Sequence, residues 1–149
     1  MKGFSKFANG FSVFVLFICM LLVVTQSAMA NSEKMIGSAE DHGIKLTINH
    51  YAIVNYGQEM MVYYTVQSKT GLLMDEDGIS LMQKPNITIG NRLVQGKDTW
   101  HKKISSQQIQ GAVKVMVPQY RPAISNVEFN TDNILNQKGQ WTINFQIKK

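Results

Sequence analysis

The chain has 149 residues, with 15 Lys and Arg against 10 Asp and Glu, and a single cysteine. The resulting net charge of +5 is a mild excess, which does not require nucleic acid as a partner. One cysteine excludes internal disulfide bonds, so the fold has to be stabilised by packing alone.

The first thirty residues are typical of an export signal. Lys2 lies in a short basic start, residues 11–24 are apolar except for one serine, and Ala28 and Ala30 occupy the small-residue positions of a cleavage site. We therefore expect a signal peptide over residues 1–30 and a secreted protein. The alternative is an uncleaved membrane helix between Phe11 and Ala30, which would tether the protein to the outer face of the cytoplasmic membrane.

Beyond this segment, residues 31–41 are polar and lack periodicity, which predicts a flexible leader. Residues 42–149 are sufficient for one domain. In this domain apolar residues recur with period two, which is typical of half-buried strands. Such strands are predicted over residues 44–54, 60–66, 79–82, 86–89, 92–94, 99–105, 112–117, 124–130 and 140–148. The stretch 60–66 is apolar on both faces and predicts a central strand, and residues 106–111 allow one helical turn at most.

Seven to nine short strands with frequent turn residues, and no convincing amphipathic helix, predict an all-β protein. We expect an immunoglobulin-like antiparallel β-sandwich. A small closed barrel shares the same alternation and remains the alternative.

Few residues are suited to catalysis or to metal binding. No two of the three histidines (His42, His50 and His101) have the spacing of metal ligands, so a solvated surface position is expected for each. The acidic cluster over residues 75–78 has too few oxygen donors for calcium and predicts a solvated turn. The sequence therefore predicts no catalytic residues, no metal and no cofactor.

A basic stretch with one large aromatic residue is the best candidate for ligand binding. It contains Lys97, Trp100, Lys102 and Lys103. Trp100 could contact a sugar or an anionic polymer. Alternatively, Trp100 packs into the core and the lysines form the solvated side of the strand, and this second arrangement is the one that we expect. On a regular strand these four residues face two sides, so one flat patch requires an edge strand or a bulge.

Tyr120 and Arg121 are a second candidate for ligand binding. They lie between Pro118 and Pro122, and this predicts a rigid exposed loop. Loops fixed by a rigid scaffold often carry recognition.

Three segments of the domain resemble the immunoglobulin-like extracellular domains of unknown function found in Gram-positive bacteria. The segments are DHGIKLTI at 41–48, VYYTVQS at 62–68 and KGQWTINFQI at 138–147. In many proteins these domains follow a transmembrane helix and an anti-sigma-factor segment. Only ten residues precede Phe11, so direct control of a sigma factor is not expected here.

The resemblance implies a non-catalytic recognition domain at the cell envelope, with an envelope protein or an anionic wall polymer as its partner. The alternative is a membrane-anchored sensory or structural accessory subunit of an envelope complex. The sequence leaves the oligomeric state open.

Overall fold

Antiparallel strands make up most of the chain described by the computed structural model, which covers residues 35–71 and 81–149. The strands are β1 (Gly37–Asp41), β2 (Ile44–Val54), β3 (Glu59–Ser68), β4 (Asn86–Ile89), β5 (Arg92–Gln95), β6 (Lys97–Ser105), β7 (Gln108–Met116), β8 (Ile124–Ile134) and β9 (Gln137–Lys148). A 3-10 turn, η2 (Asn55–Gly57), joins β2 to β3.

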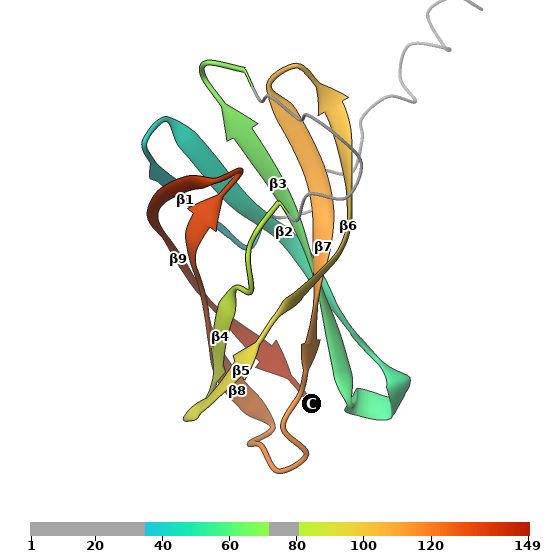
Figure 1. Ribbon diagram of the computed structural model, residues 1–149. Helices are drawn as coiled ribbons and strands as arrows, with labels where there is room; N and C mark the ends of the chain where they lie inside the picture. Colours follow the sequence, from blue (N-terminus) through green and yellow to red (C-terminus); the bar gives the residue numbers. More distant parts are fainter. Residues whose placement is uncertain (1–34, 72–80) are drawn as a thin grey trace, which may run out of the picture. The chain divides into compact units, whose positions relative to one another are not determined.

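The strands form two sheets, ordered β1-β2-β3-β7-β6 and β5-β4-β8-β9 (Figure 1). Within the described residues, no strand of one sheet pairs with a strand of the other. The predicted β-sandwich is therefore confirmed, and the closed barrel is wrong. The predicted central strand is also confirmed, because β3 is the third of five strands in its sheet.

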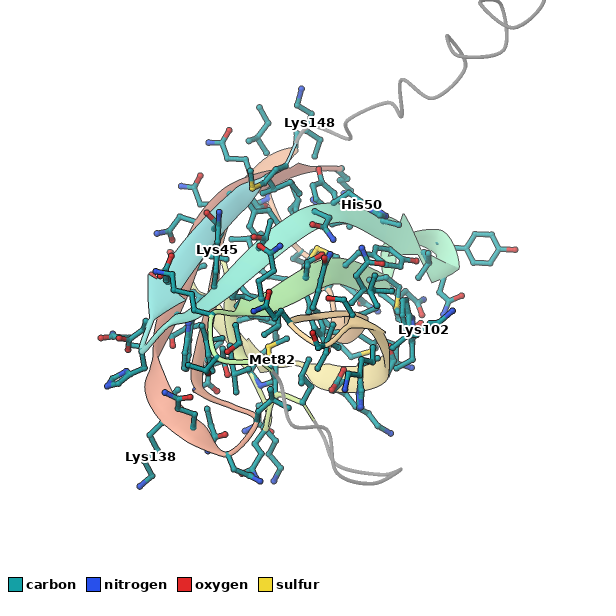
Figure 2. The ribbon with its side chains drawn as sticks, turned by 90° about the horizontal axis from the view of Figure 1, so that it is seen from above. Lys45, His50, Met82, Lys102, Lys138 and Lys148 are labelled. Carbon is teal, nitrogen blue, oxygen red and sulfur yellow. The ribbon has the colours of Figure 1, made fainter. Side chains whose placement is uncertain are left out.

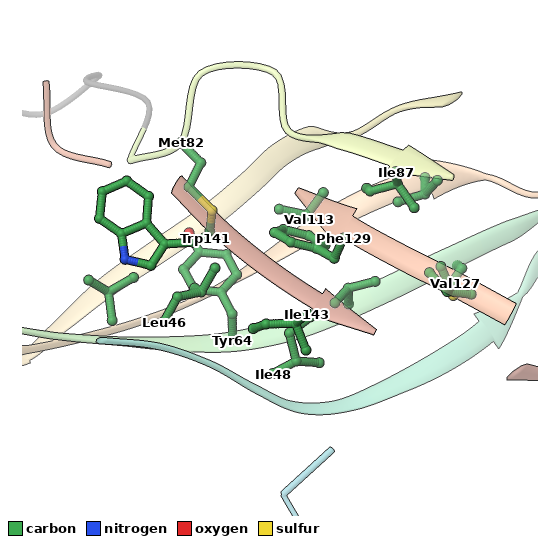
Figure 3. Packing of buried hydrophobic residues seen from close by; sticks show 14 of the residues in the cluster. Leu46, Ile48, Tyr64, Met82, Ile87, Val113, Val127, Phe129, Trp141 and Ile143 are labelled. Carbon is green, nitrogen blue, oxygen red and sulfur yellow. The ribbon is translucent and has the colours of Figure 1, made fainter. Parts of the chain in front are cut away.

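The core lies between the two sheets, where alternate residues of each strand point inward (Figure 3). Trp141 on β9 is completely buried, and its indole Nε1 donates a hydrogen bond of 2.9 Å to the carbonyl oxygen of Ile44 on β2. This bond joins the last strand of one sheet to the other sheet. It also provides a partner for the one polar atom of the indole, which would otherwise be buried without one.

The apolar residues of the last strand, which alternate with polar residues in the sequence, mostly face the core. Trp141, Ile143 and Ile147 are buried, whereas Phe145 is half-buried and stacks on Tyr51 at a ring-centroid distance of 5.9 Å.

The chain crosses from one sheet to the other at Gly96, between β5 and β6 (Figure 1). The Gly96 amide donates a hydrogen bond of 2.8 Å to the carbonyl oxygen of Pro85. A Cβ at this position would lie 2.6 Å from Val113 and 2.8 Å from Ile87, so a side chain does not fit without movement of the core. The crossing brings β6 to the free edge of the five-stranded sheet.

One prediction for local structure is wrong. The leader over residues 31–41 is in part a strand, because Gly37–Asp41 forms β1 and pairs with β2. An edge strand gains its hydrogen bonds from the backbone, so it forms without apolar alternation. Residues 106–111, for which the sequence allows one helical turn at most, hold no helix, since residues from Gln108 onward belong to β7.

Some predictions lie outside the described residues. These are the export signal or membrane helix over residues 1–30, the acidic cluster at 75–78 and the first half of the predicted strand at 79–82. The second half of that strand, Leu81 and Met82, is buried, and Met82 makes a single β-bridge with Ile134. Across residues 35–71 and 81–149, no helix has both the length and the apolar character needed to cross a membrane.

Candidate binding surface

A bulge in β6 decides which of its side chains face outward. Asp98 lies opposite Val113 of β7 and Trp100 lies opposite Ala112, so Thr99 has no partner in the ladder. The Thr99 hydroxyl donates a hydrogen bond of 2.7 Å to the Ala112 carbonyl oxygen and holds the extra residue in place. An extra residue reverses the alternation of a strand.

As a result, three of the predicted residues share one face. Lys97 lies opposite Lys114, whose neighbour Val113 is buried, so Lys97 is on the outer side of the sheet together with Trp100 and Lys102. Lys103 is opposite the buried Ile109 and points to the other side of the strand edge.

Trp100 is 46% exposed, so the interpretation in which it packs inward is wrong. Asp98 and His101 take the inward positions instead.

The pairing register extends this face across the sheet in rows. Trp100, Ala112, Tyr63 and His50 form one row over β6, β7, β3 and β2. The rings of His50 and Tyr63 stack at a centroid distance of 4.3 Å. Ala112 is completely buried although it faces outward, because the larger side chains of the face cover it.

Two further rows flank the aromatic one. Lys97 and Lys114 continue to Met61 on one side, and Lys102 and Gln110 continue to Thr65 on the other. Lys102 and His50 are labelled in Figure 2, where the molecule is seen from above. We name the following six residues the outer patch: Lys97, Trp100, Lys102, Lys114, Tyr63 and His50.

The outer patch carries an excess of positive charge. Lys97 and Lys102 are exposed, and neither makes an ion pair with another described residue. The Lys114 ammonium lies 3.4 Å from a carboxylate oxygen of Glu59 and is therefore partly neutralised. Two unpaired lysine side chains thus stand on either side of the exposed indole of Trp100.

A polar cluster lies beneath this face, where sequence reasoning predicted nothing. The side chain of Asp98 is 7% exposed and accepts hydrogen bonds of 3.1 Å from the Tyr64 hydroxyl and from the Leu81 amide. His101 Nδ1 lies 3.6 Å from the Asp98 carboxylate. A Cβ at Gly111 would collide with the Tyr64 hydroxyl, so the glycine leaves the space through which Tyr64 reaches Asp98.

The electrostatics of the cluster follow from burial. Burial raises the pKa of Asp98 above the usual carboxyl value, and the hydrogen bonds from Tyr64, Leu81 and Met82 and the nearby His101 oppose this shift. Burial and the Asp98 carboxylate also raise the pKa of Tyr64 far above its usual value. The Tyr64 hydroxyl therefore stays protonated, and it acts as a hydrogen-bond donor that ties β3 to β6.

This cluster could not be found from the sequence. Asp98 and His101 are three residues apart, and on a regular strand they would face opposite sides. Only the bulge at Thr99 turns both inward. The expectation of a solvated histidine is therefore wrong for His101, whose side chain is 19% exposed, and it holds for His42, at 59%. His50 is half-buried in its stack with Tyr63.

The second predicted site does not join the outer patch. Tyr120 lies in the loop between β7 and β8 and is 85% exposed, as expected. Arg121 is half-buried, and its Nη2 donates a hydrogen bond of 3.5 Å to the Lys148 carbonyl oxygen at the end of β9. Arg121 therefore supports the loop rather than standing free in solvent.

Histidine, cysteine and acidic side chains do not gather at a possible metal site. In the part of the chain that the structure describes, no group of three or more of them is close enough to hold an ion.

Comparisons with known proteins support the fold of the chain but do not assign the chain to a family. No family model matches the chain, and no curated protein is similar to it in sequence. Among solved structures, the crystal structure of a conserved domain protein from Bacillus anthracis is similar, with a TM-score of 0.54 and 17% sequence identity over 81% of this chain. The similar region is 44% of that protein, so the chain spans less than half of its length. At this identity the likeness concerns the fold alone.

Proposed function

We propose that this chain is a non-catalytic binding module of the bacterial cell envelope, which recognises an anionic wall polymer through the outer patch. One observation carries the proposal: the bulge at Thr99 places Lys97, Trp100 and Lys102 on a single exposed face. The export signal predicted over residues 1–30 supports an extracellular location.

The chemistry of the outer patch fits a polymer with repeated negative charges and a carbon skeleton. Lys97 and Lys102 supply exposed ammonium groups, which attract a polyanion over a distance set by the ionic strength. Trp100 supplies a flat apolar surface between them, against which sugar or polyol carbons can pack. Lysines on an edge strand commonly prevent pairing with strands of other molecules. This role does not explain why a tryptophan stays exposed between them.

The experiment is sedimentation of the purified protein with isolated Gram-positive cell wall. We expect the double variant Lys97→Gln/Lys102→Gln to bind wall on the order of tenfold more weakly than wild type at low salt. Binding of the wild type should fall steeply as salt is added, because exposed charges are screened within about 10 Å at 0.1 M.

The matched control is Lys103→Gln/Lys138→Gln, which removes the same charge from outside the outer patch. Lys103 faces the other side of β6, and Lys138 is on β9 of the second sheet; Lys102 and Lys138 project from opposite sides of the view in Figure 2. This control should retain most of the wall binding. Equal losses in the two double variants would mean that only net charge matters, and the outer patch would not be the site.

A further inference from the structure

The outward side of the four-stranded sheet has a composition that the fold does not require. Three of its rows are Asn86, Asn130 and Thr142, then Thr88, Glu128 and Asn144, then Asn126 and Gln146, and the next row is Ile124 and Lys148 at the end of β9. We name the eight residues of the three rows without a lysine the amide face. Glu128 is its only ionisable residue, in contrast to the lysines of the outer patch.

Asparagine is unfavourable in strands, where β-branched and aromatic residues are preferred. The amide face nevertheless holds four asparagines in β4, β8 and β9. The inward residues of the same strands, such as Ile87, Phe129 and Ile143, already supply the buried core. The fold therefore does not require asparagine in place of threonine at Asn86, Asn130 or Asn144.

The amide face is also hollowed. A groove of about 450 Å³ is lined by Thr88, Gly90, Asn126, Val127, Glu128, Asn144, Phe145 and Gln146. This volume is within the range of about 300–1,000 Å³ that is usual for small-molecule sites. The Gly90 amide donates a hydrogen bond of 2.8 Å to the Asn126 carbonyl oxygen, which fixes the β4–β5 turn at the end of the groove.

Most polar groups of this face are available to a ligand. Gln146 Nε2 donates a hydrogen bond of 3.0 Å to Asn126 Oδ1, and this pair joins β8 to β9. The structure records no side-chain hydrogen bond from Asn86, Asn130 or Asn144 to another described residue. Each of these amides offers two donors and one acceptor oxygen.

We propose that the amide face binds an uncharged glycan chain. Sugar hydroxyl and acetamido groups both donate and accept hydrogen bonds, which matches a row of side-chain amides and one carboxylate. A polyanion gains little in the groove, because neither lysine nor arginine lines it and Glu128 does. This site is independent of the outer patch, since it lies on the other sheet and takes a ligand of different charge.

The test uses chitohexaose, the neutral hexamer of N-acetylglucosamine, and the side-chain amide signals of the ¹⁵N-labelled protein in NMR titrations. We expect shifts in the signals of Asn86, Asn126, Asn130, Asn144 and Gln146, with little change on adding salt. The variant Asn86→Thr/Asn130→Thr/Asn144→Thr should bind at least tenfold more weakly. It should melt no lower than wild type, because threonine is the better strand residue.

The matched control replaces amides on the outer side of the five-stranded sheet, Gln67→Thr/Gln108→Thr/Gln110→Thr, and should bind chitohexaose like wild type. Unchanged binding in the triple asparagine variant would overturn the proposal, as would the absence of any amide shift at millimolar chitohexaose. Shifts of the same signals with protein concentration alone would also overturn it, since the face would then be a contact between copies. Wall binding that depends on Lys97 and Lys102 would be unaffected by each of these results.

Discussion

Asp98 is a buried, hydrogen-bonded residue whose carboxyl pKa is shifted by its surroundings. Its carboxylate is almost enclosed, and it is held by Tyr64 from the central strand and by the backbone at Leu81. Burial raises its pKa, so ionisation of this group costs folding free energy even though it has partners. A buried carboxylate of this kind ties the segment at Leu81 to the edge strand at the expense of stability.

The change Asp98→Asn is expected to alter how stability depends on pH. In wild type the folded state holds the Asp98 proton more tightly than the unfolded state does. The contribution of Asp98 to stability therefore falls as the pH rises from 3.8, the usual pKa of the carboxyl group, to the raised pKa of the folded state. An asparagine does not titrate there. Urea unfolding at several pH values should therefore show the variant gaining on wild type as pH rises through the window.

Glu40 and Asp41, whose carboxyl pKa values are lowered, lose their contributions to stability on acidification, but they do so equally in both proteins. The comparison thus isolates Asp98. A difference in the free energy of unfolding that stays constant over pH would contradict the raised pKa.

At the scale of elements, β6 combines two roles through the extra residue Thr99. Before Thr99 its inward position is Asp98, and after it the inward positions are His101 and Lys103. The outward positions are Lys97, Trp100 and Lys102. Bulges are common on edge strands and often direct a side chain to a functional position.

Deletion of Thr99 is expected to be tolerated. It removes the residue without a ladder partner, and Asp98 and Trp100 would then alternate as on a regular strand. The loss should be about 1 kcal/mol, the usual contribution of one hydrogen bond such as that from Thr99 to Ala112. Thermal melting followed by circular dichroism measures this loss.

The control is deletion of Gln110 from β7, which pairs with β3 without a register shift. In β7 the deletion would turn every inward side chain on one side of the deleted position outward, and every outward one inward. We therefore expect the variant not to fold. If both deletions unfolded the protein, the bulge at Thr99 would be structurally required.

At the scale of the whole molecule, the crossing at Gly96 connects β5 of one sheet to β6 of the other. One side carries the cationic outer patch, and the other carries the amide face, whose one ionisable residue is Glu128. The domain has no disulfide bond within its described residues, so the relation between these faces depends on core packing such as that of Trp141, Phe129 and Tyr64 (Figure 3).

The change Gly96→Ala is expected to lower the free energy of unfolding by about 1–3 kcal/mol, the usual cost of adding an atom to a packed core. The new methyl group would meet Val113, Ile87 and Pro85 at less than 3 Å, unless the core moves. Urea unfolding measures the change. The adjacent change Gln95→Ala is at an exposed position and should cost no more than about 0.5 kcal/mol. Equal stability of the two variants would show that the crossing relaxes without cost.

The alternation of apolar and polar residues by itself determined the fold class and most strand positions of this protein. In β9, for example, Trp141, Ile143 and Ile147 occupy the buried face that the pattern predicts. This succeeds because the period of a strand is local: each side chain's face follows from its immediate neighbours in the chain.

Only the tertiary structure decided which residues of the candidate site lie together. The edge position of β6, the bulge at Thr99 and the pairing of β1 with β2 all depend on partners that are distant in the sequence. One unpaired residue reverses the side to which every later side chain of the strand points. The sequence pattern therefore placed Lys97 and Trp100 on opposite sides of the strand, whereas the folded sheet places both on the outer patch.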